Sequence, residues 1–184
     1  DLSLTMAPNS PLSLTGRYEI SNGHYTLLLY DVIRREFGIE EGSTIIWMGD
    51  PLEANADISA SYEVRTSPAG LIGDQVSDPG SEKIRELETR LPFQVYLNME
   101  GSLVSPQVDF DLKVPPEART SLVEGKLAQL NQNESELNKQ VFSLLIFKDF
   151  IRSNPGETPV SYRITETART SISSMLSQQL NQFA

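Results

Sequence analysis

The most regular hydrophobic pattern in the chain runs from residue 52 to residue 64. Every second position in this segment is apolar: Leu52, Ala54, Ala56, Ile58, Ala60, Tyr62 and Val64. Polar and charged side chains occupy the positions between them. Such alternation predicts a β-strand with one dry face and one wet face. The strand would be about twice as long as the usual strand of about five or six residues.

Shorter alternating segments occupy most of the remaining first 115 residues. They run from Leu2 to Met6, Leu12 to Ile20, Tyr25 to Leu29, Phe37 to Ile39, Ile45 to Trp47, Phe93 to Met99 and Val108 to Val114. Asn22-Gly23 is a typical hairpin dipeptide, and Glu41-Gly42 predicts a tight turn. We therefore expect an antiparallel, mostly β region from residue 1 to residue 115.

The alternation fails between residues 66 and 90, where Pro and Gly recur among Asp, Ser and Glu. Few large apolar residues anchor this loop, so we expect it to be the most mobile part of the β region. Its second half, from Ser81 to Arg90, is compatible with a short helix.

The apolar spacing becomes helical after Pro115-Pro116, and residues 116–184 form a predicted helical segment. The first predicted helix has an apolar face with the spacing i, i+4 and i+7, formed by Val123, Leu127 and Leu130. A second helix can be capped by Asn133 or Ser135 and should end near residues 154–156. A third, amphipathic helix is predicted over 168–183. We expect one of the last two helices to cover apolar sheet surface or to mediate self-association of the fragment.

The composition narrows the possible partners. The 184 residues carry a net charge of −10, so binding to nucleic acid is not expected, because a polyanion would be repelled. The absence of cysteine excludes disulfides, thiolate metal sites and cysteine nucleophiles, and is weakly consistent with an oxidising compartment. The longest apolar run, 141–147, is far shorter than the ~20 residues of a membrane-spanning helix. The chain begins in mid-pattern, which favours a fragment of a longer protein.

The residues that usually carry catalysis are scarce. The single histidine, His24, follows a predicted turn, where a side chain is usually solvated. Asp109 and Asp111 share one strand face and could act as an acid–base pair or hold a hard cation, but a solvent-facing strand explains them better. We therefore expect no enzyme activity and no cofactor. Trp47 is either a core residue or an aromatic wall of a groove.

The order of the short motifs is more specific than any one of them. From residue 16 onward the chain carries, in sequence, Gly16, Tyr18, Gly23, Tyr25, Gly42-Ser43, Ile45, Trp47, Gly49-Asp50-Pro51, Asp57-Ile58, Ala60 and Tyr62. The later stretches "VYLNMEGSLVSPQVDFDLKVP" and "SSMLSQQLNQF" continue it. This ordered set resembles the C-terminal region of TamB-family proteins, the AsmA-like subunits of the translocation and assembly module, in the style of the Bacteroidetes. One departure is Ala56, where the family pattern has leucine.

The resemblance implies a mainly β fold: an elongated antiparallel sheet folded lengthwise into a β-taco-like trough, with C-terminal α-helices, in a single domain over 1–184. It also implies the periplasm, with the full-length protein anchored in the inner membrane and reaching the outer membrane. The implied partners are phospholipid acyl chains and an outer-membrane β-barrel protein of the TamA or BamA type.

Two functions follow from this resemblance. In the first, an apolar groove carries phospholipid between the two membranes. Its expected lining is Trp47, Leu52, Ala54, Ala56, Ile58, Ala60, Tyr62, Val95, Leu97, Phe110 and Leu112. Alanines on the dry face would leave width that leucines would fill. In the second, the chain docks on the outer-membrane β-barrel partner, by strand addition at an open edge. The alternative for the alanines is an ordinary core strand packed against bulky neighbours.

Overall fold

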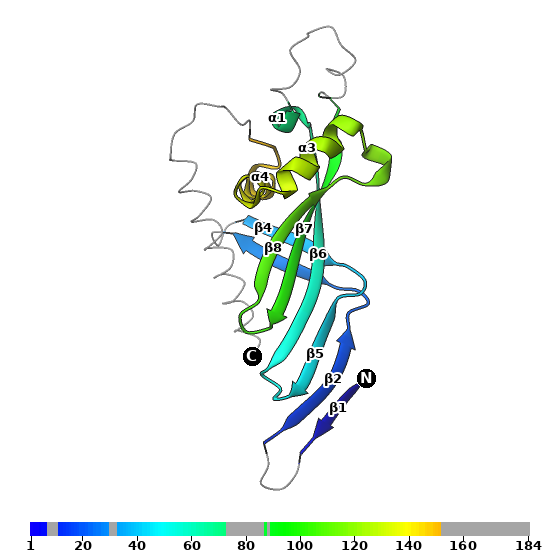
Figure 1. Ribbon diagram of the computed structural model, residues 1–184, viewed down its shortest axis with the longest axis vertical. Helices are drawn as coiled ribbons and strands as arrows, with labels where there is room; N and C mark the ends of the chain where they lie inside the picture. The colour runs from blue at the N-terminus through cyan, green and yellow to red at the C-terminus, as the bar shows by residue number, and fades with distance from the viewer. Residues whose placement is uncertain (7–10, 30–32, 73–86, 88, 152–184) are drawn as a thin grey trace. The chain divides into compact units, whose positions relative to one another are not determined.

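The computed structural model describes residues 1–6, 11–29, 33–72, 87 and 89–151 (Figure 1). These residues form an antiparallel eight-stranded sheet that does not close into a barrel, followed by helices, which confirms the predicted fold class. The described residues fall into two compact units. Unit 1 comprises 1–61 and 97–109, and unit 2 comprises 62–96 and 110–151.

The strands have the following bounds: β1 (Leu2–Thr5), β2 (Ser13–Glu19), β3 (His24–Leu29), β4 (Ile33–Ile39), β5 (Thr44–Gly49), β6 (Ala54–Thr66), β7 (Leu91–Ser102) and β8 (Gln107–Lys113). The order along the main path of the sheet is β1-β2-β5-β6-β4-β3, with β7 pairing with both β6 and β8. Strands β6, β7 and β8 contribute residues to both units.

The pairing of β2 to β5 corrects the prediction of a hairpin at Asn22-Gly23. β2 pairs with β5 and β3 pairs with β4, so the four strands form one long hairpin with a break in both arms. The break is held together by backbone bonds from Ile20 N to Ser43 O (2.8 Å) and from Ile39 N to Gly23 O (2.9 Å). Asn22-Gly23 therefore lies inside one arm. The predicted turn at Glu41-Gly42 is present in the other arm, where Gly42 has φ 90°.

The break leaves a gap in the ladder along one edge of β6, and a serine side chain fills it. β5 pairs with β6 up to Asp57, and β4 pairs with it at Ala60 and Ser61. Between them, the buried Ser43 hydroxyl accepts from Ser59 N (3.1 Å). Glu40 N donates to Ser59 O (2.8 Å), which completes the pairing of this β6 residue. The edge of β6 is thus satisfied although two separate strands cover it.

The alternation predicted for the long strand is present. In β6, Ala54, Ala56, Ile58, Ala60 and Val64 are buried, and the intervening residues are more exposed. The strand nevertheless begins at Ala54 instead of Leu52. Asp50-Pro51-Leu52-Glu53 forms a turn, closed by a bond from Glu53 N to Asp50 O (3.0 Å), so Leu52 lies outside the ladder.

The described helices belong to unit 2: α1 (Ala69–Ile72), the 3-10 turn η2 (Pro116–Ala118), α3 (Ser121–Asn131) and α4 (Glu134–Phe147). The buried stripe of α3 consists of the three residues predicted from the sequence. Asn133 caps α4, accepting from Glu136 N (3.2 Å), as predicted. α4 ends earlier than predicted, because Lys148 adopts a left-handed conformation with φ 57°.

Two further predictions concern segments that are only partly described. The loop predicted over 66–90 contains α1, whereas residues 73–86 and 88 lie outside the described residues. Its mobility stays a prediction. The helix predicted over 168–183 lies wholly outside the described residues.

Candidate functional site

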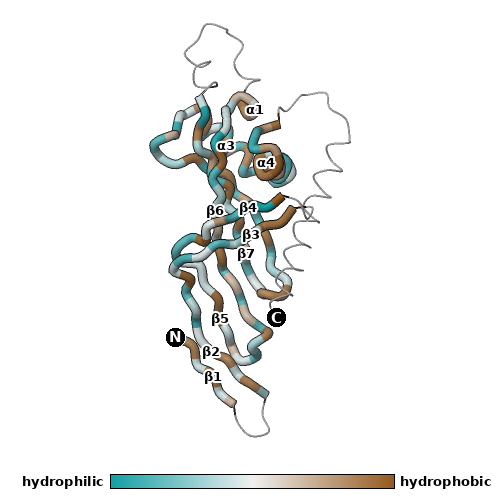
Figure 2. The backbone as a smooth tube through the Cα atoms, turned by 180° about the vertical axis from the view of Figure 1, so that it is seen from behind, coloured by the Kyte–Doolittle hydropathy of each residue, from teal (hydrophilic) through white to brown (hydrophobic). Residues whose placement is uncertain are grey.

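The sheet of unit 1 has one apolar face that can be followed from strand to strand by register. Directly opposed residues of an antiparallel pair lie on the same face. Leu4 pairs with Leu14, Tyr18 with Ile45, and Ile45 with Ala56. We call this surface the apolar face of unit 1; it comprises Leu2, Leu4, Leu14, Gly16, Tyr18, Ile45, Trp47, Gly49, Ala54, Ala56, Ile58 and Ala60. Figure 2 shows apolar positions recurring along these strands.

Exposure changes steadily across this face. On β6 the alanines are buried, and on β5 Ile45 and Trp47 are half-buried. On β2 Leu14 and Gly16 are half-buried, whereas Tyr18 is 50% exposed, and on β1 Leu4 is 65% and Leu2 48% exposed. We call the three exposed residues the open strip. Isolated exposed apolar side chains are normal, but a contiguous apolar strip is a feature of binding surfaces.

Trp47 lies where the buried and the open parts of the face meet. Its neighbours in register are Gly16 on one side and Ala54 on the other, so neither places a bulky side chain beside the indole. The indole N–H donates to Pro51 O (3.1 Å), which satisfies its only polar atom. Trp47 therefore adds a large apolar surface to the face, and its position is compatible with a groove wall.

The residues predicted to line a groove are divided between the two units. Unit 1 contains Trp47, Leu52, Ala54, Ala56, Ile58, Ala60 and Leu97, and unit 2 contains Tyr62, Val95, Phe110 and Leu112. All of them except Leu52, Trp47, Tyr62 and Phe110 are buried. Leu52 is 63% exposed and lies in the turn before β6. The open strip was not among the predicted residues, although the alternation of Leu2, Leu4 and Tyr18 was visible in the sequence.

The apolar side of the unit 2 sheet is filled by protein. Phe93 of β7 makes an edge-to-face contact with Phe150, with ring centroids 4.7 Å apart. Gly70 of α1 lies against Phe150, since a Cβ there would meet the Phe150 carbonyl oxygen at 2.7 Å. Phe150 follows the end of α4 at Phe147, so the segment after the helix makes this contact, and covering of open sheet surface by a helix stays a prediction.

Polar side chains fix the segment after α4. The buried Gln140 donates to Ile151 O (2.8 Å) and accepts from Ile151 N (3.0 Å). Ser143 donates to Asp149 O (2.7 Å), and Thr66 of β6 donates to the Asp149 carboxylate (2.7 Å). Unit 2 is therefore closed by specific contacts on this side.

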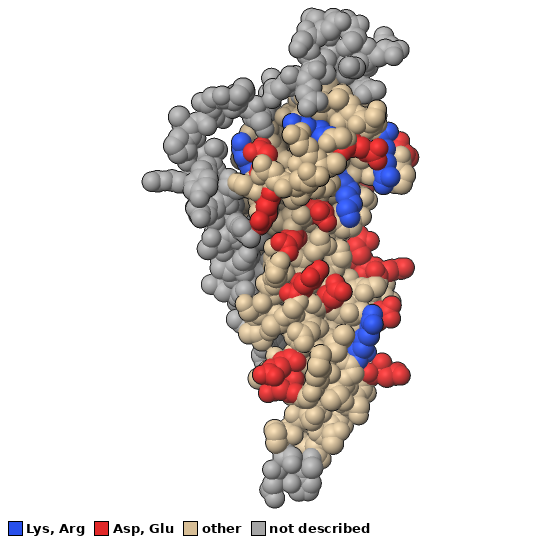
Figure 3. Space-filling model, viewed as in Figure 1, with Lys and Arg blue, Asp and Glu red and all other residues tan. Residues whose placement is uncertain are grey.

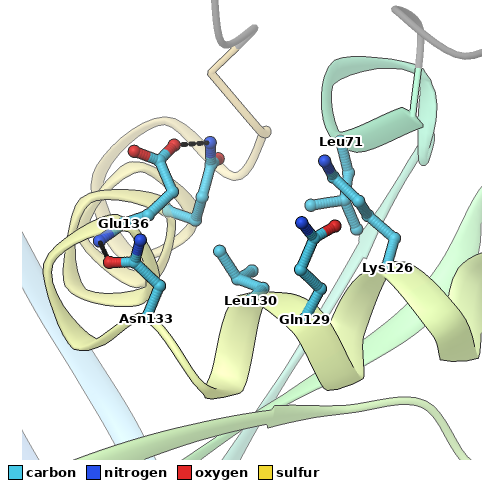
Figure 4. A pocket seen from close by; sticks show the side chains of 7 residues that line it. Leu71, Lys126, Gln129, Leu130, Asn133 and Glu136 are labelled. Carbon is cyan, nitrogen blue, oxygen red and sulfur yellow. Dashed lines mark hydrogen bonds between the residues drawn. The ribbon is translucent and has the colours of Figure 1, made fainter.

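A hollow of about 110 Å³ lies between α1, α3 and α4 in the described part of unit 2. The Gln140 side chain donates to Glu136 (3.2 Å), and Figure 4 shows Glu136 on one side of the hollow and Lys126 and Gln129 on the other. The hollow is lined by Leu71, Lys126, Gln129, Leu130, Asn133, Glu136 and Gln140. Its volume is well below the roughly 300–1,000 Å³ of typical ligand pockets, and its lining includes the charged Lys126 and Glu136, so it does not suit an acyl chain.

No catalytic arrangement emerges from the residues that the structure describes. Within them, no group of three or more His, Asp or Glu side chains is placed to hold a metal ion. Asp109 and Asp111 lie on β8, and Gln107 donates to Asp109 (2.9 Å). A search of the same described residues for a helix long and apolar enough to cross a membrane found none.

Comparison with known protein families decides the classification. A profile of the TamB C-terminal domain matches residues 1–184. The chain belongs to the TamB family. No curated protein and no solved structure is significantly similar to it.

Membership of the TamB family places the chain in the outer-membrane translocation and assembly module. TamB proteins are non-enzymatic transport and assembly proteins, periplasmic and anchored in the inner membrane, with a TamA-type partner in the outer membrane. The predicted family is thereby confirmed.

Proposed function

We propose that the apolar face of unit 1 binds phospholipid acyl chains and carries phospholipid between the inner and the outer membrane. The observation that supports this function is the open strip of Leu2, Leu4 and Tyr18, which continues in register toward Trp47 and the alanines of β6. An acyl chain needs a dry lining without polar demands, and this face supplies one.

The opposite face of the same strands supports the assignment. Ser3 and Thr5 of β1, together with Thr15, Arg17 and Glu19 of β2, alternate with the open strip. In the view of Figure 3, the charged side chains over the strands of unit 1 are mostly acidic. On β5 the opposite face carries Ile46 and the exposed Met48, so the contrast between an apolar and a polar face is clearest on β1 and β2.

Native mass spectrometry of the gently purified chain tests this function. The double variant Leu2→Gln with Leu4→Gln should lose co-purifying phospholipid, because it makes the open strip polar. The control is Ser3→Gln with Thr5→Gln, which changes the same strand on the other face. Both variants alter exposed side chains, so their stability should stay within about 0.5 kcal/mol of the parent. Equal lipid content in both variants would remove the proposed role of this face.

A second function, docking on an outer-membrane β-barrel protein by strand addition, is favoured by one observation. Among the described strands, β1 pairs only with β2 and β3 only with β4, whereas the outer edge of β8 is occupied. There the Asn131 side chain accepts from Leu112 N (3.1 Å) and donates to Leu112 O (3.0 Å). Blocking edges in this way is a common means of preventing strand addition.

The two functions predict different effects at β1. Asp1 and Arg17 exchange backbone bonds, so Ser3, two residues on, faces β2 in the same way. The N–H groups at the open edge therefore belong to Leu2 and Leu4. Substituting Leu4 with proline removes one of these edge donors and keeps an apolar side chain on the apolar face. If docking by strand addition is the main role, this variant should lose capture of the purified TamA-type partner and keep bound lipid. If lipid carriage is the main role, the Leu2→Gln, Leu4→Gln double variant should lose more bound lipid than the proline variant.

A further inference from the structure

Two described connections between strands, β5–β6 and β7–β8, lie at the same end of unit 1, and each presents an apolar side chain to solvent. β1 runs toward this end, β2 starts there, β5 ends there, and β6 starts there, because these neighbours are antiparallel. The turn after β7 joins them through a bond from Leu103 N to Ala54 O (2.8 Å). We call this region the hairpin end; its exposed apolar residues are Met6, Leu12, Met48, Leu52 and Val104. Figure 1 shows the β5–β6 and β7–β8 connections at the lower left of these strands.

Two of these residues occupy turn positions that are usually polar. Leu52 is the third residue of the turn Asp50–Glu53, and Val104 is the third residue of the turn Ser102–Ser105, closed from Ser105 N to Ser102 O (3.1 Å). Gly, Asn, Asp and Ser are the residues that turn geometry favours there. Leu52 and Val104 are largely exposed, so packing within the described part of unit 1 does not account for them.

The first turn is held rigidly. The Asp50 carboxylate accepts from Leu52 N (2.9 Å), and the Trp47 indole of β5 donates to Pro51 O (3.1 Å). Because the turn is already ordered, little backbone entropy is lost when its apolar side chain becomes buried in a binding partner.

The charges around the hairpin end indicate which surface it suits. Segments 50–53 and 103–106 contain no Lys or Arg, whereas Asp50 and Glu53 are present and exposed. Such an end would be repelled by an anionic lipid surface. Carboxylates are compatible with the ammonium groups of zwitterionic headgroups, and the apolar tips can enter the boundary between headgroups and acyl chains.

We propose that the hairpin end of unit 1 inserts into the surface of a zwitterionic phospholipid bilayer. This goes beyond acyl-chain binding on the apolar face, because it involves turn residues outside the strands and a bilayer instead of a single lipid. A bilayer contact at this end would bring Trp47, which braces the first turn, next to the surface from which lipid is exchanged.

Co-sedimentation with phosphatidylcholine vesicles tests the proposal. The variant Leu52→Asn with Val104→Ser replaces both turn residues by ones that suit turns. Each of the two substitutions removes one apolar side chain from the contact with lipid and should weaken vesicle binding by about tenfold. The matched control is Phe147→Ser in unit 2, which removes a side chain of similar exposure (69%) and should leave vesicle binding unchanged. Vesicles containing phosphatidylglycerol should bind less of the parent chain.

The outcomes separate this proposal from the proposed function. The Leu2 and Leu4 double variant should lose co-purified lipid and still sediment with vesicles, and the turn variant should show the reverse. The proposal is overturned if the parent chain does not sediment with vesicles, if the turn variant sediments like the parent, or if Phe147→Ser weakens binding equally. It is also overturned if anionic vesicles bind more tightly, or if binding appears only when the vesicles contain an outer-membrane barrel protein.

Discussion

Units 1 and 2 use the same kind of sheet and treat its apolar side differently. Nearly all large hydrophobic residues exposed among the described residues belong to unit 1, and the exception is Phe147. In unit 2 the apolar side of β7 is covered by Phe150, and the edge of β8 is capped by Asn131. The same chain thus covers the apolar side of one sheet region and leaves that of another exposed. The open strip of unit 1 therefore favours a binding function.

The largest effect should follow from a cavity in the filled unit. Leu144 of α4 is fully buried, so Leu144→Ala should lower the free energy of unfolding by about 2–5 kcal/mol. Leu4→Ala in unit 1 removes a similar side chain from an exposed position and should cost less than about 0.5 kcal/mol. Urea denaturation of both variants measures the difference. Equal losses would mean that the exposed strip contributes to the core, and the contrast between the units would fail.

A smaller effect is expected at the capped edge. Asn131→Ala leaves the Leu112 N–H and C=O groups without their side-chain partner, at a cost of about 1–3 kcal/mol. The control is Gln132→Ala, which changes the neighbouring residue, an exposed one. The uncovered edge should also promote self-association, which light scattering at several concentrations would detect. An Asn131→Ala protein as stable and as monomeric as the control would show that the cap is dispensable.

The alanines of β6 sharpen the comparison within unit 1. If lipid reaches them, Ala56→Leu should abolish bound phospholipid and leave the thermal midpoint nearly unchanged. If instead protein fills the space beside Ala56, the added methyl groups should overpack the core at about 1–3 kcal/mol. Measuring lipid content and thermal stability on the same sample separates these cases. Lost stability with unchanged lipid would make Ala56 an ordinary core residue.

The smallest effect concerns Tyr25, whose side chain lies on β3 of unit 1. Burial raises the pKa of Tyr25 to about 12, because the charged phenolate is disfavoured there. The unfolded chain releases this proton near pH 10, so the contribution of Tyr25 to stability is complete below pH 10 and is lost as the pH rises toward 12. Tyr25→Phe should flatten the loss of stability in this window. Identical alkaline unfolding curves for the two proteins would argue against burial of the phenol.

The sequence predicted those features that depend on local periodicity. The alternation of β6, the buried stripe of α3 and the Asn133 cap all follow from nearest neighbours along the chain. The pairing of β2 with β5 was missed, because Asn22-Gly23 is a strong local turn signal and the long-range ladder overrides it. Leu52 matched the alternation, but the Asp50 carboxylate and the Trp47 indole stabilise a turn there.

The candidate site was predictable only in part for a similar reason. Periodicity assigns residues to a face, and it does not show which part of that face is covered. The buried Ala54 and the exposed Leu4 have equivalent positions in their alternating patterns. Only the pairing order, which places β1 farthest from β6, distinguishes them.

Trp47 allows the central claim to be tested directly, because it is the only tryptophan of the chain and lies on the apolar face of unit 1. The measurement is quenching of its fluorescence by a brominated lysophospholipid kept below its micelle concentration, so that single acyl chains are the only lipid present. The account predicts saturable quenching in the parent chain, loss of quenching in the Leu2→Gln, Leu4→Gln variant and normal quenching in the Ser3→Gln, Thr5→Gln control. Absence of quenching in the folded parent chain, or equal quenching in all three proteins, would contradict it.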